Sequence, residues 1–180
     1  MEKRLFMNKK NRCILGICSI ILFVMLDQFT KYLASTYLKG GNSISLIKGV
    51  FQLHYLENRG AAFGLMQGMK VWFVIGTVLM LGIIFVLYWR SPMEKKFHGA
   101  RSIMILLASG AFGNLIDRLR LDYVVDFLYF ELINFPIFNV ADIYVTCGMA
   151  LLIILGLFYY SEEDWERLIS FRKKRESISS

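Results

Sequence analysis

Three aspartates beside apolar sequence have the clearest potential for chemistry in this 180-residue chain. Asp27 follows the uncharged stretch CILGICSIILFVML, Asp126 lies within VVDFLYF, and Asp142 follows FNVA. An ionised aspartate at mid-bilayer depth costs roughly 2.5 to 3.5 kcal/mol even on a lenient insertion scale. In a membrane, each of these residues therefore needs a partner or a function.

Carboxylates are also what remains when other catalytic sets are searched for. The sequence has two histidines, His54 and His98, and contains neither Gly-x-Ser-x-Gly nor His-Glu-x-x-His. It therefore lacks the catalytic motifs of a serine hydrolase and of a zinc protease. Two aspartates held a few ångströms apart in a low-dielectric site cannot both ionise. One keeps its proton while the other deprotonates a water, as in aspartic proteases.

The composition indicates a membrane protein. Hydrophobic residues make up 56% of the chain and charged residues 19%, with a mean hydropathy of +0.50, whereas soluble domains have about 45–50% apolar and about 25% charged residues. These values exclude a soluble enzyme, a disulfide-built secreted module and a disordered chain. The net charge of +7 comes from basic clusters beside apolar runs, which indicates contact with lipid headgroups and cytoplasm and argues against nucleic acid.

Four apolar runs have the length of about 20 residues that a helix needs to cross a bilayer. They cover about residues 13–34, 71–89, 102–120 and 140–160. We therefore expect one integral membrane domain over residues 1–180, an all-α bundle with an outer loop over 35–70 and a cytoplasmic tail over 161–180. No small-residue processing site follows the first run, so we interpret it as a retained span and not as a signal peptide.

The basic residues predict the orientation of the bundle. The N-terminal tail carries five Lys and Arg residues, the segment between the second and third spans four, and the C-terminal tail five, which is two thirds of the 21 in the chain. The positive-inside rule then places both termini in the cytoplasm and the loop over 35–70 outside.

With this orientation, the polar residues of the spans gather near the outer surface. Asp27 lies in the outer half of the first span, Asn114 and Arg118 end the third, and Asn139 and Asp142 begin the fourth. A proton or ion pathway would thread carboxylates through the full thickness. The layer therefore favours chemistry at the outer surface on a substrate that arrives through the lipid, and a small ion-coupled transporter using the same carboxylates is the alternative.

One segment between the spans has the pattern of a strand. Residues 50–55 (Val-Phe-Gln-Leu-His-Tyr) alternate partly between apolar and polar side chains and lie between glycine-bearing stretches, which predicts a short strand or hairpin. Its apolar face could pack only on the membrane surface or on the helix ends. We expect a platform over the bundle.

Five short blocks, in order along the chain, resemble the lipoprotein signal peptidases, or signal peptidase II, of bacterial cytoplasmic membranes. The blocks are Asp27-Gln28-Phe29-Thr30-Lys31, Asn58-Arg59-Gly60-Ala61-Ala62-Phe63-Gly64, Gly110-Ala111-Phe112-Gly113-Asn114-Leu115-Ile116-Asp117-Arg118-Leu119, Val124-Val125-Asp126-Phe127 and Phe138-Asn139-Val140-Ala141-Asp142. Each block is weak evidence alone, but five in order on a four-span chain make a chance resemblance improbable.

The resemblance implies an intramembrane aspartic endopeptidase that removes the signal peptide of a diacylglyceryl-modified prolipoprotein, cutting before the lipidated cysteine. By motif match, Asp126 and Asp142 form the catalytic dyad. The match places seven residues around the dyad as support or substrate contacts: Asn58, Arg59, Asn114, Arg118, Asn139, Asp27 and Lys31.

The resemblance also implies a four-helix bundle with a small extracytoplasmic β cradle and a short interfacial helix. The active site should face outward from the bacterial cytoplasmic membrane. No metal and no organic cofactor are expected, and the expected surroundings are membrane lipids around a monomer.

Structural roles stay open for several residues. Asp126 and Asp142 lie near span ends, where an aspartate can cap a helix. Asp27 and Lys31 are four apart on one helix face and are expected to neutralise each other. Which member of the dyad acts as the base is not readable from the sequence.

Other polar residues of the third and fourth spans also have two interpretations. Arg118 is expected either to pair with Asp117 or to face the dyad, where it could hold a substrate carbonyl. Asn114 and Asn139 could join helices by hydrogen bonds or support the dyad.

The third span carries small residues, and the chain departs mildly from the family pattern there and nearby. Ser109, Gly110 and Gly113 predict close helix packing. Ser109 stands where the family often has a second glycine, Asp122 near a usual glycine, and Ile143 where a small polar residue is common. These departures concern local backbone geometry and substrate preference, and they leave both aspartates in place.

Overall fold

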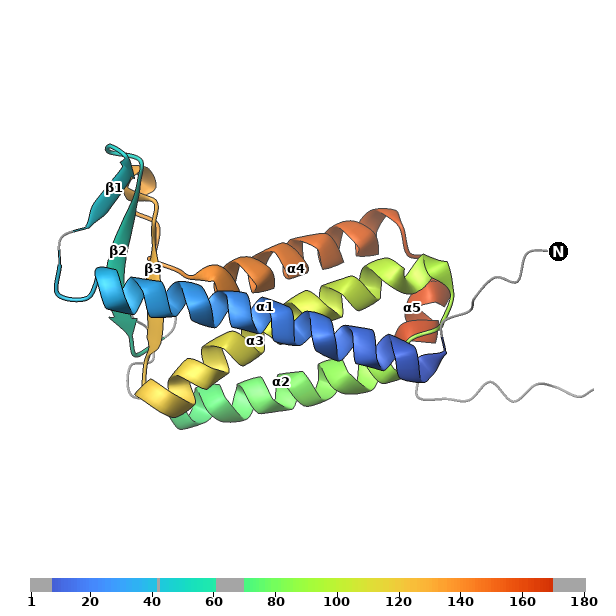
Figure 1. The fold of residues 1–180 in the computed structure, drawn as a ribbon. Coiled ribbons are helices and arrows are strands. Elements are labelled where there is room, and N and C mark those ends of the chain that lie inside the picture. The colour runs from blue at the N-terminus through green and yellow to red at the C-terminus, as the bar shows by residue number, and fades with distance from the viewer. Residues whose placement is uncertain (1–7, 42, 61–69, 170–180) are drawn as a thin grey trace, which may run out of the picture.

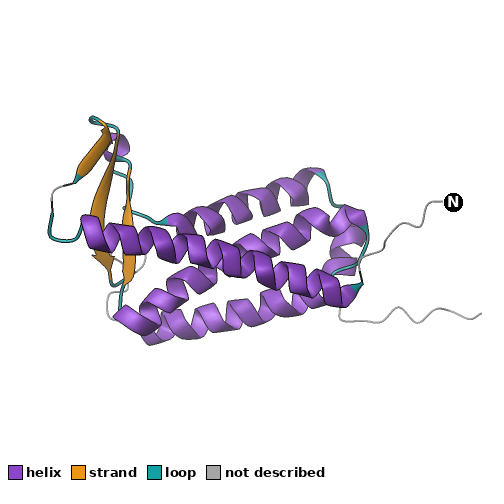
Figure 2. Ribbon diagram, in the orientation of Figure 1, coloured by secondary structure: helices purple, strands orange, loops and turns teal. Residues whose placement is uncertain are grey.

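The structure, a computed structural model, describes residues 8–41, 43–60 and 70–169. Four long helices run side by side in an elongated bundle (Figure 1). They are α1 (Lys9–Tyr37), α2 (Lys70–Arg90), α3 (His98–Leu121) and α4 (Val140–Phe158). A small sheet lies at one end of the bundle and the short helix α5 (Glu162–Ile169) at the other (Figures 1 and 2). Two 3-10 helices, η2 (Lys95–Phe97) and η3 (Glu131–Ile133), precede α3 and follow the last strand.

In the described ranges, these four helices are the ones long and apolar enough to cross a membrane. The predicted spans 13–34, 71–89 and 102–120 lie inside α1, α2 and α3, whereas the fourth, 140–160, passes the end of α4. This helix stops early because the N–H groups of Tyr159 and Tyr160 both donate to the carbonyl of Leu155. The predicted fold class, a helical bundle of four candidate spans with a minor β element, is confirmed.

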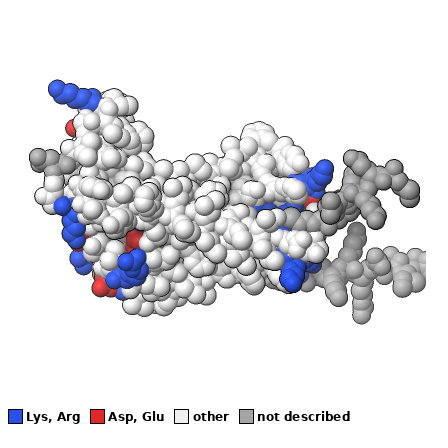
Figure 3. Space-filling model, viewed as in Figure 1, with Lys and Arg blue, Asp and Glu red and all other residues white. Residues whose placement is uncertain are grey.

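Helix α3 lies at the centre of the bundle and packs against the other three helices. Half of the residues in its apolar 18-residue stretch are buried, whereas at most 17% are buried in the corresponding stretches of α1, α2 and α4. The exposed apolar side chains of those three helices form the surface that a bilayer would cover. Figure 3 shows this middle part without charged residues and with charges gathered towards both ends.

The sheet has three antiparallel strands in the order β1 (Ile44–Ile47), β2 (Phe51–Asn58) and β3 (Val124–Tyr129). The strand predicted at 50–55 is β2, which forms a hairpin with β1. Gly49 takes a positive φ of 74° in the turn between them, a conformation that glycine adopts without steric cost. The short helix implied by the resemblance after Gly60 would fall on residues outside the described ranges.

Strand β3 was not predicted from the sequence. Its first four residues are all buried, so VVDFLY shows none of the alternation that marks a half-exposed strand. Val125 and Phe127 pack into a cluster with the end of α1. Successive side chains of a strand point to opposite faces, so Asp126 faces away from this cluster, on the face that it shares with Asn58 of β2.

Two glycines of α3 allow the close packing predicted for this helix. A Cβ atom on Gly110 would lie 2.4 Å from the carbonyl oxygen of Ala141 in α4, and one on Gly113 would lie 2.5 Å from a carboxylate oxygen of Asp27 in α1. Real Cβ atoms essentially never come within 3.0 Å of such neighbours. These glycines therefore fix how the first turn of α4 and Asp27 lie against α3.

The glycine contact predicts the effect of a single methyl group. Gly110→Ala should lower the midpoint of thermal unfolding in detergent, because the backbone of α4 must move, and overpacking typically costs about 1–3 kcal/mol. Gly76→Ala in α2 is the control, since a Cβ there meets no heavy atom within 4 Å, and its midpoint should not fall. Equal midpoints for Gly110→Ala and the unmodified protein would contradict this packing.

Candidate active site

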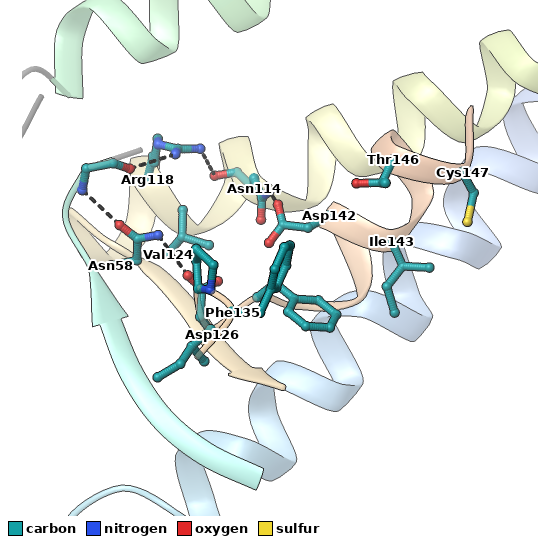
Figure 4. A pocket seen from close by; sticks show the side chains of 14 residues that line it. Asn58, Asn114, Arg118, Val124, Asp126, Phe135, Asp142, Ile143, Thr146 and Cys147 are labelled. Atoms are coloured by element: carbon teal, nitrogen blue, oxygen red, sulfur yellow. Dashed lines mark hydrogen bonds between the residues drawn. The ribbon is translucent and has the colours of Figure 1, made fainter. Parts of the chain in front are cut away.

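A pocket of about 460 Å³ opens where the sheet meets the ends of α3 and α4 (Figure 4). Asp126 and Asp142 both line it, although one comes from β3 and the other from the first turn of α4. Six other residues of the sequence-predicted site or its motifs also line the pocket: Asn58, Gly60, Asn114, Arg118, Val124 and Phe138. The structure thus brings the two predicted dyad residues to one cavity.

Asp126 is 1% exposed, and both of its carboxylate oxygens accept a hydrogen bond from an asparagine. Asn139 Nδ2 donates to Oδ1 at 2.6 Å, and Asn58 Nδ2 donates to Oδ2 at 2.8 Å. Burial and the nearby carboxylate of Asp142 raise the pKa of Asp126 to about 7, against the lowering effect of the two amides. A group with this pKa can hold or release a proton near neutral pH.

Asp142 both caps a helix and lines the pocket. Asn139 is the N-cap of α4, and its side chain accepts the N–H of Asp142 at 3.0 Å while Asp142 Oδ2 accepts the N–H of Asn139 at 3.1 Å. Asn114 Nδ2 donates to the other oxygen, Oδ1, at 2.8 Å. The reciprocal capping box fixes the direction of the Asp142 side chain. Asn139 therefore contacts both aspartates at once.

A buried ammonium group orients Asn114. Lys31 Nζ lies 3.0 Å from oxygens of both Asp27 and Asp117 and donates to Asn114 Oδ1 at 2.9 Å. Asn139 Nδ2 donates to the same oxygen at 3.1 Å. With its oxygen held by two donors, the Asn114 side chain must present its NH₂ group to Asp142. The predicted pair of Asp27 and Lys31 is present and is part of a larger network.

The carboxylates of this network also hold the backbone of the site. Asp27 Oδ1 accepts the N–H of Ala141 at 2.9 Å, and Asp117 Oδ2 accepts the N–H of Val125 at 3.1 Å. These bonds attach the residues that immediately precede Asp142 and Asp126 in sequence. Asp27 and Asp117 thus position the aspartates through the main chain.

Gln28 is a member of the network that the sequence analysis did not select. Its Nε2 donates to Asp117 Oδ1 at 2.9 Å, to the carbonyl of Gly113 at 3.1 Å and to Asp27 Oδ2 at 3.2 Å. Its place next to Asp27 in the first motif block was the one sign of its role in the sequence. The sequence alone does not identify the partners of a single polar residue in a span.

The two predicted arginines take different positions. Arg118 lies over the ring of Phe73 at 4.9 Å and donates to the carbonyls of Asn114 and Gly60 at 3.5 Å. It makes no ion pair with Asp117 in the described part of the chain, and it lines the pocket. Arg59 is exposed, lies 3.4 Å from Glu57 and stacks on Tyr123, and the structure does not place it at the dyad.

The pocket continues along α4 as a mainly apolar wall that the motifs did not indicate. Ile143, Thr146 and Cys147 form one side, and residues 135–138 form another. Position 143, where the chain departs from the family pattern, thus borders the cavity. No group of acidic, cysteine or histidine side chains suited to a metal ion is found among the described residues.

Comparisons with known proteins agree with this arrangement. The family model described as signal peptidase (SPase) II matches residues 19–158. Lipoprotein signal peptidases of Streptococcus pyogenes serotypes M5 and M18 are 38% identical over 165 residues, covering 92% of this chain and 99% of each relative.

Two solved structures are also similar. A bacterial membrane enzyme determined at 2.3 Å by the in meso method has a TM-score of 0.72 at 32% identity, over 90% of this chain and 93% of that one. Another, at 1.9 Å, has a TM-score of 0.69 at 33% identity, over 81% and 94%. The chain belongs to the signal peptidase II family of aspartic-type membrane proteases.

Proposed function

We propose that this protein removes the signal peptide of diacylglyceryl-modified prolipoproteins, cutting before the lipidated cysteine, and that Asp126 and Asp142 are its catalytic dyad. The observation that carries the proposal is the shared pocket, where two carboxylates from distant segments each receive N–H donors on both oxygens. The names of the streptococcal relatives support the substrate class.

The proposed reaction uses a dyad that holds one proton. The ionised member takes a proton from a water as the water oxygen attacks the scissile carbonyl carbon, and the protonated member donates to the carbonyl oxygen. When the tetrahedral intermediate collapses, the C–N bond breaks and the leaving nitrogen takes up the proton that came from the water. A hydroxyl of the intermediate returns a proton to the other aspartate, so the dyad again holds one proton. The raised pKa of Asp126 supports assigning the starting proton to Asp126 and the base to Asp142, although the proton belongs to the pair.

The surrounding residues have positioning roles in this proposal. Asn58, Asn114 and Asn139 keep the carboxylate oxygens in place, and Lys31 acts on Asp142 through Asn114. Arg118 faces the pocket as a cation able to hold a carbonyl oxygen of the substrate. The apolar wall along α4 suits a substrate that stays in the lipid.

Replacing either dyad member tests the proposal most directly. Asp126→Asn and Asp142→Asn should each lower kcat/KM for a lipidated precursor by about 10³-fold or more, because the shared proton is lost. Asp122→Asn is the control, since Asp122 is an exposed residue paired with Lys70, and it should retain activity. A chelator should leave wild-type cleavage unchanged. If either dyad variant folds and still cleaves, or if the wild type moves solute across vesicles without cleaving, the proposal fails.

The pH profile should report the proton on the dyad. The pKa of Asp126, raised from 3.8 to about 7, keeps this proton up to neutral pH. Above that pH Asp126 loses this proton, so kcat/KM should fall as the pH rises through about 7. Asn58→Ala removes an N–H that lowers this pKa, so the alkaline limb should move to higher pH. Ser43→Ala, which alters an exposed contact with His54 in the same sheet, should not move it.

We also propose that both termini lie in the cytoplasm and that the pocket faces outward. The start of α1, the end of α2 and α5 lie at one end of the bundle, and the sheet lies at the other (Figure 1). The pocket is lined by residues of the sheet, so placing one terminus also places the pocket. Reporter fusions at Pro92 and at the C-terminus should report cytoplasm, and a fusion at Gly41 should report the outside. The reverse pattern would place the dyad on the wrong side for an exported substrate.

A further inference from the structure

A second cavity, of about 360 Å³, lies far from the dyad, between α1 and α2 with α3 as its floor. Its lining has no exposed polar surface, and it includes Gly16 of α1, Trp89 of α2 and Ala108 of α3. The three helices are candidate membrane spans. The medium around this groove is therefore hydrocarbon, and a flexible apolar chain is what would fill it.

Two buried arginines lie at the end of this groove away from the sheet. Arg12, 2% exposed, donates to the carbonyls of Trp89 and Ser91 at 2.9 and 2.8 Å. Arg101, 5% exposed, donates to the carbonyls of Pro92 and Glu94. Neither guanidinium has a carboxylate within ion-pair distance in the part of the chain that the structure describes, and Arg12 Nε has no hydrogen-bond partner there.

Two acidic residues at this end of the bundle, Asp164 and Glu94, pair with Lys96 and Arg167 and not with these arginines. The C-terminus of α2 supplies the equivalent of about half a negative charge. This offsets about a quarter of the total positive charge of the two guanidinium groups. Lys9 and Lys10, both exposed, precede Arg12 in the first turn of α1 and add positive charge. Burying a cation without a counter-charge is costly, so this end of the groove attracts an anion.

The same end has the aromatic residues of a membrane interface. Tyr88 and Trp89 line the groove, and the guanidinium of Arg12 lies 5.5 Å from the centre of the Tyr88 ring. Tyrosine and tryptophan favour the headgroup level of a bilayer. A phosphate at this level would be close to the cations, while an attached acyl chain would continue into the apolar groove.

We propose that this groove binds a phospholipid with an anionic headgroup, with one acyl chain between α1 and α2 and the phosphate bound by the exposed Lys9 and Lys10, near the buried charge of Arg12. The site belongs to the membrane leaflet at the α5 end of the bundle. It is separate from the pocket of the dyad and does not depend on the proposed reaction.

The test uses the full-length protein in a neutral detergent, titrated with phosphatidylglycerol or with phosphatidylcholine of the same acyl chains. Phosphatidylglycerol should raise the midpoint of thermal unfolding at about 25-fold lower mole fraction, because each of the two exposed lysines, Lys9 and Lys10, strengthens anionic lipid binding about fivefold. Native mass spectrometry should show one retained phosphatidylglycerol. Equal titrations with the two lipids, or the same shift with inorganic phosphate alone, would overturn the proposal.

Variants separate the groove from the headgroup site. Ala108→Leu fills the floor of the groove and should abolish lipid retention, whereas Ala150→Leu, on an exposed face of α4, should not. Lys9→Gln with Lys10→Gln should weaken the preference for phosphatidylglycerol by about fivefold per cation, whereas Lys48→Gln at the sheet should not. If Ala108→Leu does not fold, the Lys9→Gln and Lys10→Gln variant still tests the site. An unchanged preference for phosphatidylglycerol in that variant would refute the proposal.

Discussion

One buried ammonium group, that of Lys31, organises the polar end of the bundle. It lies between the carboxylates of Asp27 and Asp117 and donates to Asn114, while the two carboxylates accept main-chain N–H groups of α4 and β3. Removing one partner of a buried ion pair typically costs about 3–5 kcal/mol. Because Lys31 and both carboxylates are buried, the relative positions of α1, α3, α4 and β3 depend on this one charge being satisfied.

The asparagines of the pocket extend that constraint to the aspartates. Lys31 fixes the oxygen of Asn114, so the amide of Asn114 faces Asp142, and Asn139 joins Asp142 to Asp126 through its backbone and side chain. Neutral amide donors hold the carboxylates without adding charge. Burial can therefore keep the pKa of Asp126 near neutrality, which a neighbouring cation in direct contact would have lowered. The charge of Lys31 is separated from Asp142 by the amide of Asn114.

The two ends of the bundle treat their buried cations differently. At the sheet end, Lys31 is paired with carboxylates from its own and a neighbouring helix. At the α5 end, Arg12 and Arg101 bind main-chain carbonyls in the last turn of α2 and in the segment after it. In the first arrangement the cation is neutralised by carboxylates, which also hold the main chain next to Asp126 and Asp142. The second leaves positive charge beside an apolar groove, and it suits contact with the anionic surface of a membrane.

The sequence by itself determined the four spans, the hairpin and the one-sided layer of polar residues, because apolar length and the cost of a charge in lipid are local properties. It did not reveal β3, the role of Gln28 or the outward position of Arg59. A strand buried on both faces lacks alternation, and a hydrogen bond needs a partner from a distant segment. Only the tertiary structure decided that Asp126 and Asp142 share a pocket, since pairing of β3 with β2 and packing of α4 on the glycines of α3 bring them together.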